Sequence, residues 1–143
     1  MKKAARRCLE LGFDAIDINM GCPDRLIEKQ GCGAAMIKNP EQARAIIAAA
    51  KRGGKGQANG TEKELPVSVK TRIGYNTDSL EEWLPALLYA KPAAITLHVR
   101  TRKEMSKVPA KWDRIKRAVE IRDELKSETL IIGNGDVTDL PDA

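Results

Sequence analysis

Aromatic residues are scarce in this chain of 143 residues, since Phe, Trp and Tyr together supply only 3% of it. That share is low for a complete domain of this size. Long apolar runs are also missing. No stretch reaches the roughly 18 residues that a membrane-spanning helix needs, so no membrane partner is expected. The basic N-terminal segment lacks the apolar core of about 7–15 residues that marks a secretory signal peptide.

Cysteine and histidine are equally sparse, with three cysteines (Cys8, Cys22 and Cys32) and a single histidine, His98. An odd number of cysteines without short paired spacing argues against a disulfide framework and favours a reducing cytoplasm. A structural zinc site needs four closely placed ligands, and these residues do not supply them. The sequence therefore predicts no metal.

The charge excess is moderate. Lys and Arg number 25 against 20 Asp and Glu, which gives a net charge of +5, and apolar residues make up 42% of the chain. This balance is ordinary for a globular protein and excludes a low-complexity disordered chain. It permits a polyanionic partner without demanding one.

Hydrophobic periodicity predicts helices and strands in alternation. The expected helices span 2–11, 41–52, 77–90 and 112–125, and the expected strands span 13–19, 65–74, 93–98 and 129–137. Asn39 and Pro40 suit the cap and the first position of the second helix. The alternation predicts an α/β fold in which helices flank a parallel sheet, although four strands cannot close an eight-stranded barrel of about 250 residues.

Two local expectations accompany this pattern. Residues 53–64 are polar and rich in glycine, which predicts a flexible connector. The helix at 112–125 is amphipathic, and its spacing predicts that Trp112, Ile115, Val119 and Leu125 face inward.

Polar side chains of the kinds used in catalysis come at the carboxyl end of every predicted strand. They are Asn19, Lys70, Arg72, His98, Asn134 and Asp136. In α/β barrels and open α/β sheets, this end of the strands carries the functional groups. The strand ends are therefore considered together as one candidate site.

Two of these strand ends suggest specific chemistry. Cys22 follows the first strand, where an accessible thiol can act as a nucleophile or a proton donor, although a buried cysteine that serves only packing is common. Lys70 and Arg72 share one face of the second strand and suit an anion such as a phosphate or an anionic heterocycle. The alternative is one inward group and one surface ion pair.

The remaining strand ends are weaker signals by themselves. His98, as a lone histidine, is more typical of a satisfied core residue. The basic residues Arg100, Arg102 and Lys103 after it suit nucleic-acid phosphates or simply a solvated surface. The Gly-rich segment at 134–136 can bind phosphate through backbone amides or form a plain turn.

Together, however, these segments resemble the tRNA-dihydrouridine synthases, in that family's order and over nearly the whole chain apart from 53–64. The segments are DINMGCP (17–23), GCGAAM (31–36), PVSVKTRIG (66–74), ITLHVRTRKEM (95–105), KVPAKWD (107–113) and IIGNGDV (131–137). The combination of NMGCP, VKTR and GNGD is specific, whereas any one of them is not. Val99 departs from the family pattern, which has glycine there.

The resemblance implies a flavin enzyme with a TIM (β/α)8 barrel and a C-terminal helical tRNA-binding domain. Such an enzyme reduces the C5–C6 bond of particular uridines in tRNA, with NADPH reloading FMN. Residues 1–143 then correspond to a partial flavin-binding barrel, roughly strands three to six. The flanking strands and the helical domain are expected to lie outside this chain, so it is expected to be a fragment.

The resemblance also implies roles for individual residues. Cys22 is expected to donate a proton to C5 of the uracil, while the flavin delivers hydride to C6. Lys70 and His98 are expected to lie against the flavin. The substrate contacts are expected from Asn19, Arg72 and Arg100, and the ribityl-phosphate contacts from Asn134, Gly135 and Asp136. The thiol, the lysine and the imidazole should therefore converge on one face.

Two alternatives remain at this point. A dihydroorotate-dehydrogenase-like flavoprotein also has an asparagine before a Cys-Pro pair and a strand-end lysine, but a small pyrimidine acid needs no basic stretch such as residues 99–107. A catalytically inactive fragment that retains RNA affinity without flavin is the second alternative.

Overall fold

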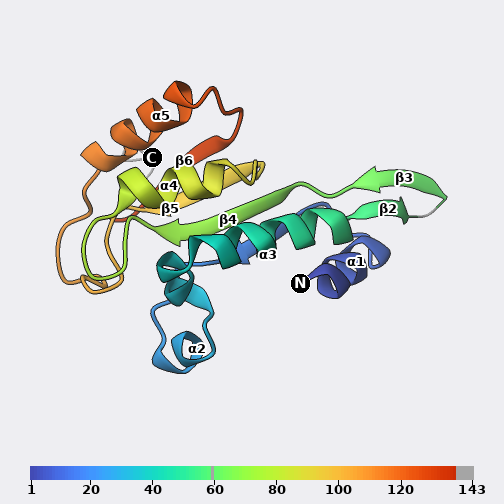
Figure 1. The fold of residues 1–143 in the computed structure, drawn as a ribbon, viewed down its shortest axis with the longest axis horizontal. Coiled ribbons are helices and arrows are strands. Elements are labelled where there is room, and N and C mark those ends of the chain that lie inside the picture. Colours follow the sequence, from blue (N-terminus) through green and yellow to red (C-terminus); the bar gives the residue numbers. More distant parts are fainter. Residues whose placement is uncertain (59, 138–143) are drawn as a thin grey trace.

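A four-stranded parallel sheet organises the computed structural model, which describes residues 1–58 and 60–137 (Figure 1). Its strands lie in the order β1-β4-β5-β6, and all three pairings are parallel. The strands are β1 (Ile16–Asn19), β4 (Val67–Arg72), β5 (Ala94–His98) and β6 (Leu130–Asn134). The α/β pattern and the parallel sheet predicted from the sequence are therefore confirmed.

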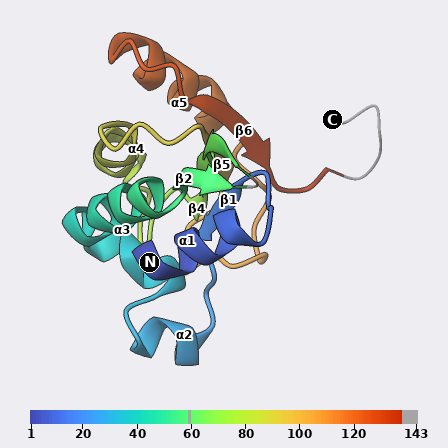
Figure 2. The same cartoon turned by 90° about the vertical axis from the view of Figure 1, so that its right-hand side faces the viewer.

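Helices cover one side of this sheet. Figure 2 shows α3 (Pro40–Gly53), α4 (Leu80–Leu88) and α5 (Asp113–Glu124) on the same side of the strands. The first helix, α1 (Lys2–Glu10), packs against α3. Between β1 and α3 lie the short helix α2 (Arg25–Lys29) and a 3-10 helix, η1 (Gly33–Lys38). Among the described residues, no helix combines the length and the apolar character needed to cross a bilayer.

Burial alternates along each strand, as it must when only one face of a sheet is packed. In β4, Val67, Val69 and Thr71 are buried towards the helices, whereas Ser68 and Lys70 are only half-buried on the other face. We call this second side the open face. It carries Asp17, Asn19, Ser68, Lys70, Arg72, Ala94, Thr96, His98, Leu130, Ile132 and Asn134.

The predicted start of α3 is confirmed in detail. The Asn39 side-chain oxygen accepts a hydrogen bond from the Gln42 amide at 3.1 Å, and Pro40 is the first helical residue. Asparagine satisfies an orphan donor at this position, and proline loses no hydrogen bond there.

The prediction of a flexible connector at 53–64 is wrong. Residues Lys55–Ala58 (β2) and Thr61–Glu64 (β3) form an antiparallel hairpin, which extends from the end of the sheet where β4 begins (Figure 1). The composition argument considered only apolar burial, whereas the hairpin is held by backbone pairing of its two strands. Lys55 pairs with Glu64 at 3.3 Å, and the Lys63 ammonium lies 3.0 Å from the Asp14 carboxylate.

The predicted inward face of the last helix is wrong at both ends. Trp112 and Leu125 are 42% and 38% exposed, while Ala118 and Ile121 are buried. The reason is that α5 spans only Asp113–Glu124, so both residues lie outside it. Trp112 instead lies over Gly133, where an added Cβ would come within 2.6 Å of the indole.

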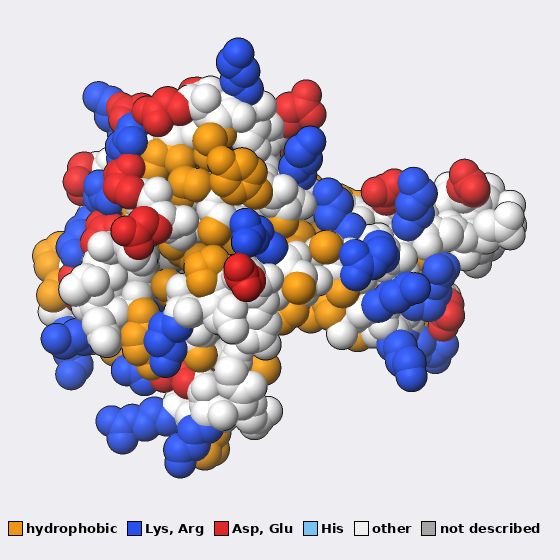
Figure 3. Space-filling view, in the orientation of Figure 1, with side chains coloured by type: hydrophobic (Ala, Val, Ile, Leu, Met, Phe, Trp, Pro, Cys, Tyr) orange, Lys and Arg blue, Asp and Glu red, His pale blue; other side chains and the backbone are white. Residues whose placement is uncertain are grey.

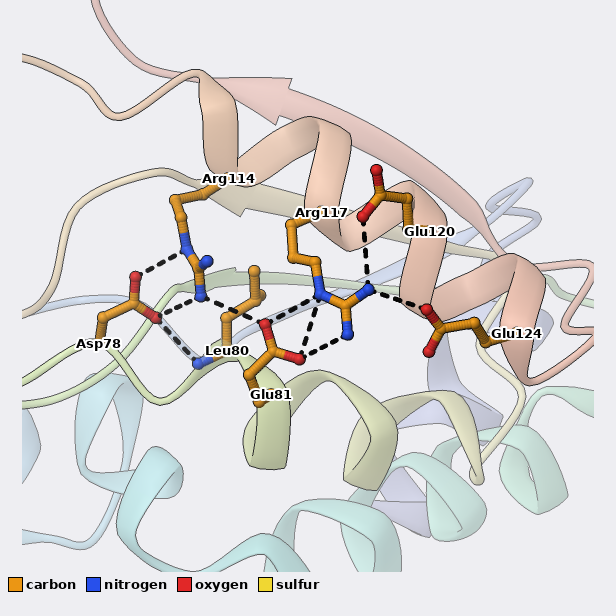
Figure 4. Close-up of polar contacts among 7 residues, drawn as sticks. All are labelled: Asp78, Leu80, Glu81, Arg114, Arg117, Glu120 and Glu124. Atoms are coloured by element: carbon orange, nitrogen blue, oxygen red, sulfur yellow. Dashed lines mark hydrogen bonds and ion pairs between the residues drawn. The ribbon is translucent and has the colours of Figure 1, made fainter.

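An ion-pair network joins α4 to α5 (Figure 4). Arg117 lies 2.8 Å from Glu81 and 2.8 Å from Glu124, and Arg114 lies 2.8 Å from Asp78. The carboxylates raise the pKa of Arg117, and Arg117 lowers the pKa of Glu81. Because the Glu81 and Glu124 side chains are more than half exposed, each of their pairs with Arg117 adds little stability on its own.

Candidate active site

Register brings the predicted strand-end residues side by side on the open face. Asn19 pairs with Lys70 across β1 and β4, and Arg72 pairs with His98 across β4 and β5. His98 in turn pairs with Asn134 of β6. Because the strands are parallel and in register, their carboxyl ends form one edge, and the side chains of four strands meet there.

Asn19 shapes the loop that carries Cys22. Its side-chain oxygen accepts hydrogen bonds from the backbone amides of Gly21 and Cys22, each at 3.0 Å. This leaves the amide nitrogen as the end of the Asn19 side chain that can donate to a ligand. The Cys22 side chain is a half-buried free thiol.

The glycine-rich segment 31–36 packs directly on this loop. The Ala34 amide donates to the Cys22 carbonyl at 2.8 Å. Gly33 has a φ of +60°, and an added Cβ there would lie 2.6 Å from the Cys22 carbonyl oxygen. Glycine is therefore required at position 33 both by the backbone conformation and by the close approach.

Arg72 joins this loop to the one that follows β5. It is only 9% exposed, and its Nε donates to the Gly21 carbonyl at 3.0 Å. Its Nη1 donates to the carbonyls of Thr101 and Met105 at 3.2 and 3.1 Å. Burial and the nearby Arg100 lower its pKa, while Cys22 acts in the opposite direction. The guanidinium thus binds protein carbonyls, and its contact with substrate stays a prediction.

His98 is held by a buried arginine. The Arg100 Nη1 lies 3.2 Å from His98 Nε2, and a guanidinium can only donate, so Nε2 accepts. The neutral ring therefore carries its proton on Nδ1. Burial, followed by Arg72, Lys70 and Arg100, lowers the pKa of His98 to about 4. The imidazole is neutral near pH 7, with Nδ1–H as its donor.

Asp136 holds Arg100 in turn. Arg100 Nη2 donates to both carboxylate oxygens of Asp136, at 2.5 and 2.6 Å, and the Ala110 amide donates to the same carboxylate at 2.7 Å. Gly135 lies against His98, since an added Cβ would come within 3.4 Å of the ring. The sequence placed Asn134, Gly135 and Asp136 together at this edge, and the structure does the same. Their contact with a cofactor stays a prediction.

Lys70 lies on the open face of β4, the strand between β1 and β5. Burial and Arg72 lower its pKa, and Asp17 raises it. Lys70 pairs with Thr96, which precedes His98 by two residues on the same face of β5. Lys70 and His98 thus share the open face, and Cys22 joins the same edge through its amide bond to Asn19. Their convergence on a cofactor stays a prediction.

Sequence reasoning missed two polar links behind this edge. Thr71 Oγ1 donates to the Met20 carbonyl at 3.1 Å, and Trp83 Nε1 donates to Thr71 Oγ1 at 3.1 Å. Arg102 pairs with Glu28 from the other side of the loop. The sequence placed Arg102 only in a basic loop, and no sequence signal near Glu28 indicates that the two residues pair.

Two further kinds of site were sought in the described residues: a cavity and a cluster of metal ligands. A pocket of about 710 Å³ opens at the amino ends of β5 and β6, lined in part by Leu88, Pro92 and Thr129, far from the strand-end residues. Within residues 1–58 and 60–137, no three His, Cys, Asp or Glu side chains gather as metal ligands would.

Comparison with protein-family models identifies the family of this chain. The family model described as dihydrouridine synthase (Dus) matches residues 1–143. The chain belongs to the dihydrouridine synthase family. The resemblance predicted from NMGCP, VKTR and GNGD is thereby confirmed, and so is the fold class. The four parallel strands are part of the Dus TIM barrel.

Curated Dus relatives give the same result. The chain is 44% identical over 131 residues to a probable tRNA-dihydrouridine synthase of Staphylococcus epidermidis (strain RP62A). It is 45% identical over 131 residues to a probable tRNA-dihydrouridine synthase 2 of Bacillus subtilis (strain 168). Each match covers 91% of this chain and 37% of the relative. The chain therefore spans a little over a third of the length of these relatives.

Proposed function

We propose that this chain carries the central part of a site that reduces the C5–C6 bond of uridines in tRNA to 5,6-dihydrouridine. The observation that carries the proposal is the strand register that brings Asn19, Lys70 and His98 to one edge of the open face, with the Cys22 amide bonded to Asn19. The relatives named tRNA-dihydrouridine synthases support it. FMN is the proposed cofactor and NADPH the proposed reductant.

The donor set of the open face fits FMN. Lys70 supplies a half-buried cation for an electron-rich heterocycle, and the neutral His98 offers one N–H donor. Gly135 keeps the space beside His98 free of a side chain. When bound, FMN would supply the hydride that C6 of the uracil receives, and the protein would supply orientation. Asn134 and the backbone around Gly135 would hold the ribityl-phosphate side.

Cys22 is the proposed proton donor. Its S–H bond breaks as a C–H bond forms at C5 of the uracil, which balances the hydride gained at C6 and leaves a thiolate to be reprotonated from solvent. Asn19 is proposed to donate from its amide nitrogen to a carbonyl of the base. Such a role requires a free thiol, and a reducing cytoplasm, the proposed location, keeps it so.

The tRNA partner fits the charge at this end of the molecule. Arg25 and Lys29 on α2, and Lys103 and Lys107 in the loop after β5, are exposed near the Cys22 loop. Figure 3 shows Lys and Arg side chains at the lower end of the molecule, over α2. Exposed cations bind RNA phosphates, and the target base must leave its stack to reach a thiol. Arg72 and Arg100 are proposed to contact the bound nucleotide from the carboxyl edge of the sheet.

The experiment compares Cys22→Ala with Cys8→Ala in the purified protein, with FMN, NADPH and unmodified tRNA. General acid catalysis contributes about 10²–10⁴-fold, so Cys22→Ala should lose that much dihydrouridine formation, measured by mass spectrometry of nuclease digests. Cys8→Ala should match the unaltered protein, and both should keep the visible absorbance of flavin. Unchanged activity in Cys22→Ala would contradict the proposal, as would turnover of dihydroorotate in place of tRNA.

A further inference from the structure

Four backbone groups around Cys22 are hydrogen-bonded, and three of their partners come from other segments of the fold. The loop is held through the Gly21 carbonyl, the Cys22 amide, the Cys22 carbonyl and the Pro23 carbonyl. Their partners are, in that order, Arg72 Nε at 3.0 Å, Asn19 Oδ1 at 3.0 Å, the Ala34 amide at 2.8 Å and Arg102 Nη2 at 3.4 Å. The position of the thiol is thus set by contacts on both of its sides.

The helix that follows this loop has little apolar anchorage. In the described part of the chain, the helix α2 buries no apolar side chain, since Leu26 and Ile27 are 69% and 38% exposed. Asp24 caps it by accepting from the amides of Leu26 and Ile27. Hydrophobic packing therefore does not fix α2, and a polar contact has to do so.

That contact is the ion pair between Glu28 and Arg102. Arg102 Nε lies 2.9 and 3.0 Å from the two oxygens of Glu28, and Arg102 Nη2 also donates to Glu28. The Glu28 side chain is 8% exposed and that of Arg102 is 23% exposed. Fork-like pairing fixes both direction and distance, unlike a simple surface pair. One guanidinium therefore binds both α2 and the residue next to Cys22.

Arg102 is itself placed by a neighbouring loop. Its backbone amide donates to the Gly74 carbonyl at 2.9 Å, and the next amide, of Lys103, donates to the Tyr75 carbonyl at 2.9 Å. Its guanidinium lies 5.4 Å from the centre of the Tyr75 ring. The loop after β4 thus fixes Arg102, and Arg102 fixes the segment with the thiol.

We propose that Glu28 and Arg102 are positioning residues for Cys22, which hold the thiol where it can protonate the uracil. This inference rests on the proposed function. Neither residue touches the base or the cofactor in this role. A misplacement of about 1 Å can cost on the order of 10²-fold in rate, so a loosened loop should lower turnover much more than binding.

The test compares Glu28→Gln and Arg102→Lys with Glu81→Gln and Arg117→Lys, which break an ion pair of the α4–α5 network instead. Glu28→Gln keeps the volume but removes the charge. Arg102→Lys keeps the charge but removes the fork. Both should lower kcat for tRNA by roughly 10- to 100-fold with little change in KM. Glu28→Asp, which keeps the carboxylate, should recover part of the loss, and the two control variants should leave kcat unchanged.

A second measurement does not depend on catalysis. Hydrogen–deuterium exchange of the amides of Cys22 and Ala34 should become faster in Glu28→Gln, because these bonds open with the loop. Alkylation of Cys22 should accelerate as well, while Cys8 on α1 serves as the internal standard. The control variants should change neither quantity.

The outcomes separate the two proposals. Unchanged exchange, alkylation and kcat in Glu28→Gln would overturn the positioning role, even if Cys22→Ala is inactive. A rise in KM alone would also overturn it, because it would make the pair a tRNA contact. Faster exchange in Glu28→Gln together with full activity in Cys22→Ala would leave the loop contact standing and refute the proposed function instead.

Discussion

The indole nitrogen of Trp83 donates a 3.1 Å hydrogen bond to the hydroxyl of Thr71, which itself donates to the Met20 carbonyl. All three residues are at most 2% exposed. The chain of bonds runs from helix α4 through strand β4 to the residue that follows β1. It fixes the start of the Cys22 loop from inside the core.

Replacing Thr71 by valine should therefore destabilise the protein. The change leaves a buried indole N–H and a buried carbonyl without partners, at a cost of about 1–3 kcal/mol for an unsatisfied group. Urea unfolding should show this loss. The matched control is Thr61→Val in the exposed hairpin, where Thr61 donates to Ala58 and water can replace the lost bond. Equal effects at the two positions would contradict the argument.

The tautomer and pKa of His98 can be measured directly, because it is the only histidine in the chain. We expect a pKa of about 4, since burial and three neighbouring cations disfavour the imidazolium. We expect the proton on Nδ1, since Arg100 donates to Nε2. Nitrogen-15 NMR of labelled protein reports both. A pKa near 6.5, or a proton on Nε2, would show that the contact with Arg100 is not formed in solution.

The same shift predicts how folding depends on pH. The unfolded chain binds a proton on His98 near its ordinary pKa of 6.5, whereas the folded chain does so only near a pKa of about 4. The contribution of this residue to stability is therefore complete above pH 6.5 and declines as pH falls towards 4. Urea midpoints across this range should fall less steeply in His98→Asn than in the unaltered protein. Parallel slopes would contradict the prediction.

Gly33 and Gly31 form a matched pair for testing the contact behind Cys22. Both have positive φ, of +60° and +72°, but only an added Cβ at Gly33 would meet the Cys22 carbonyl. Gly31→Ala should cost about 1–2 kcal/mol through the backbone conformation alone. Gly33→Ala should cost more and also change the alkylation rate of Cys22. Thermal unfolding and thiol kinetics measure the two effects, and identical behaviour of the two variants would exclude the contact.

Much of this architecture follows from the sequence because periodic burial is a local signal. Alternating residues such as Val67 and Val69 predict a strand, and the helix–strand alternation predicts the parallel sheet. Since parallel strands share one carboxyl edge, Asn19, Lys70 and His98 could be expected to meet there. The family resemblance added which chemistry this edge performs.

What the sequence did not predict depends on contacts between distant residues. Glu28 looks like any exposed helical glutamate until the fold brings Arg102 to it. The ion pair between Asp136 and Arg100 was not predicted, and the cofactor contact expected of Asp136 stays a prediction. The hairpin at 55–64 forms through backbone pairing of two polar strands, which composition does not report.

The loop with Cys22 is held by residues that the ribosome adds much later than the loop itself. Arg72 lies 51 residues beyond the Gly21 carbonyl that it binds, and Arg102 lies 79 residues beyond the Pro23 carbonyl. Synthesis proceeds from the N-terminus, and contacts of such long separation form slowly. On the ribosome, the contacts that hold Cys22 can therefore be completed only after α3, β4, α4 and β5 have been synthesised.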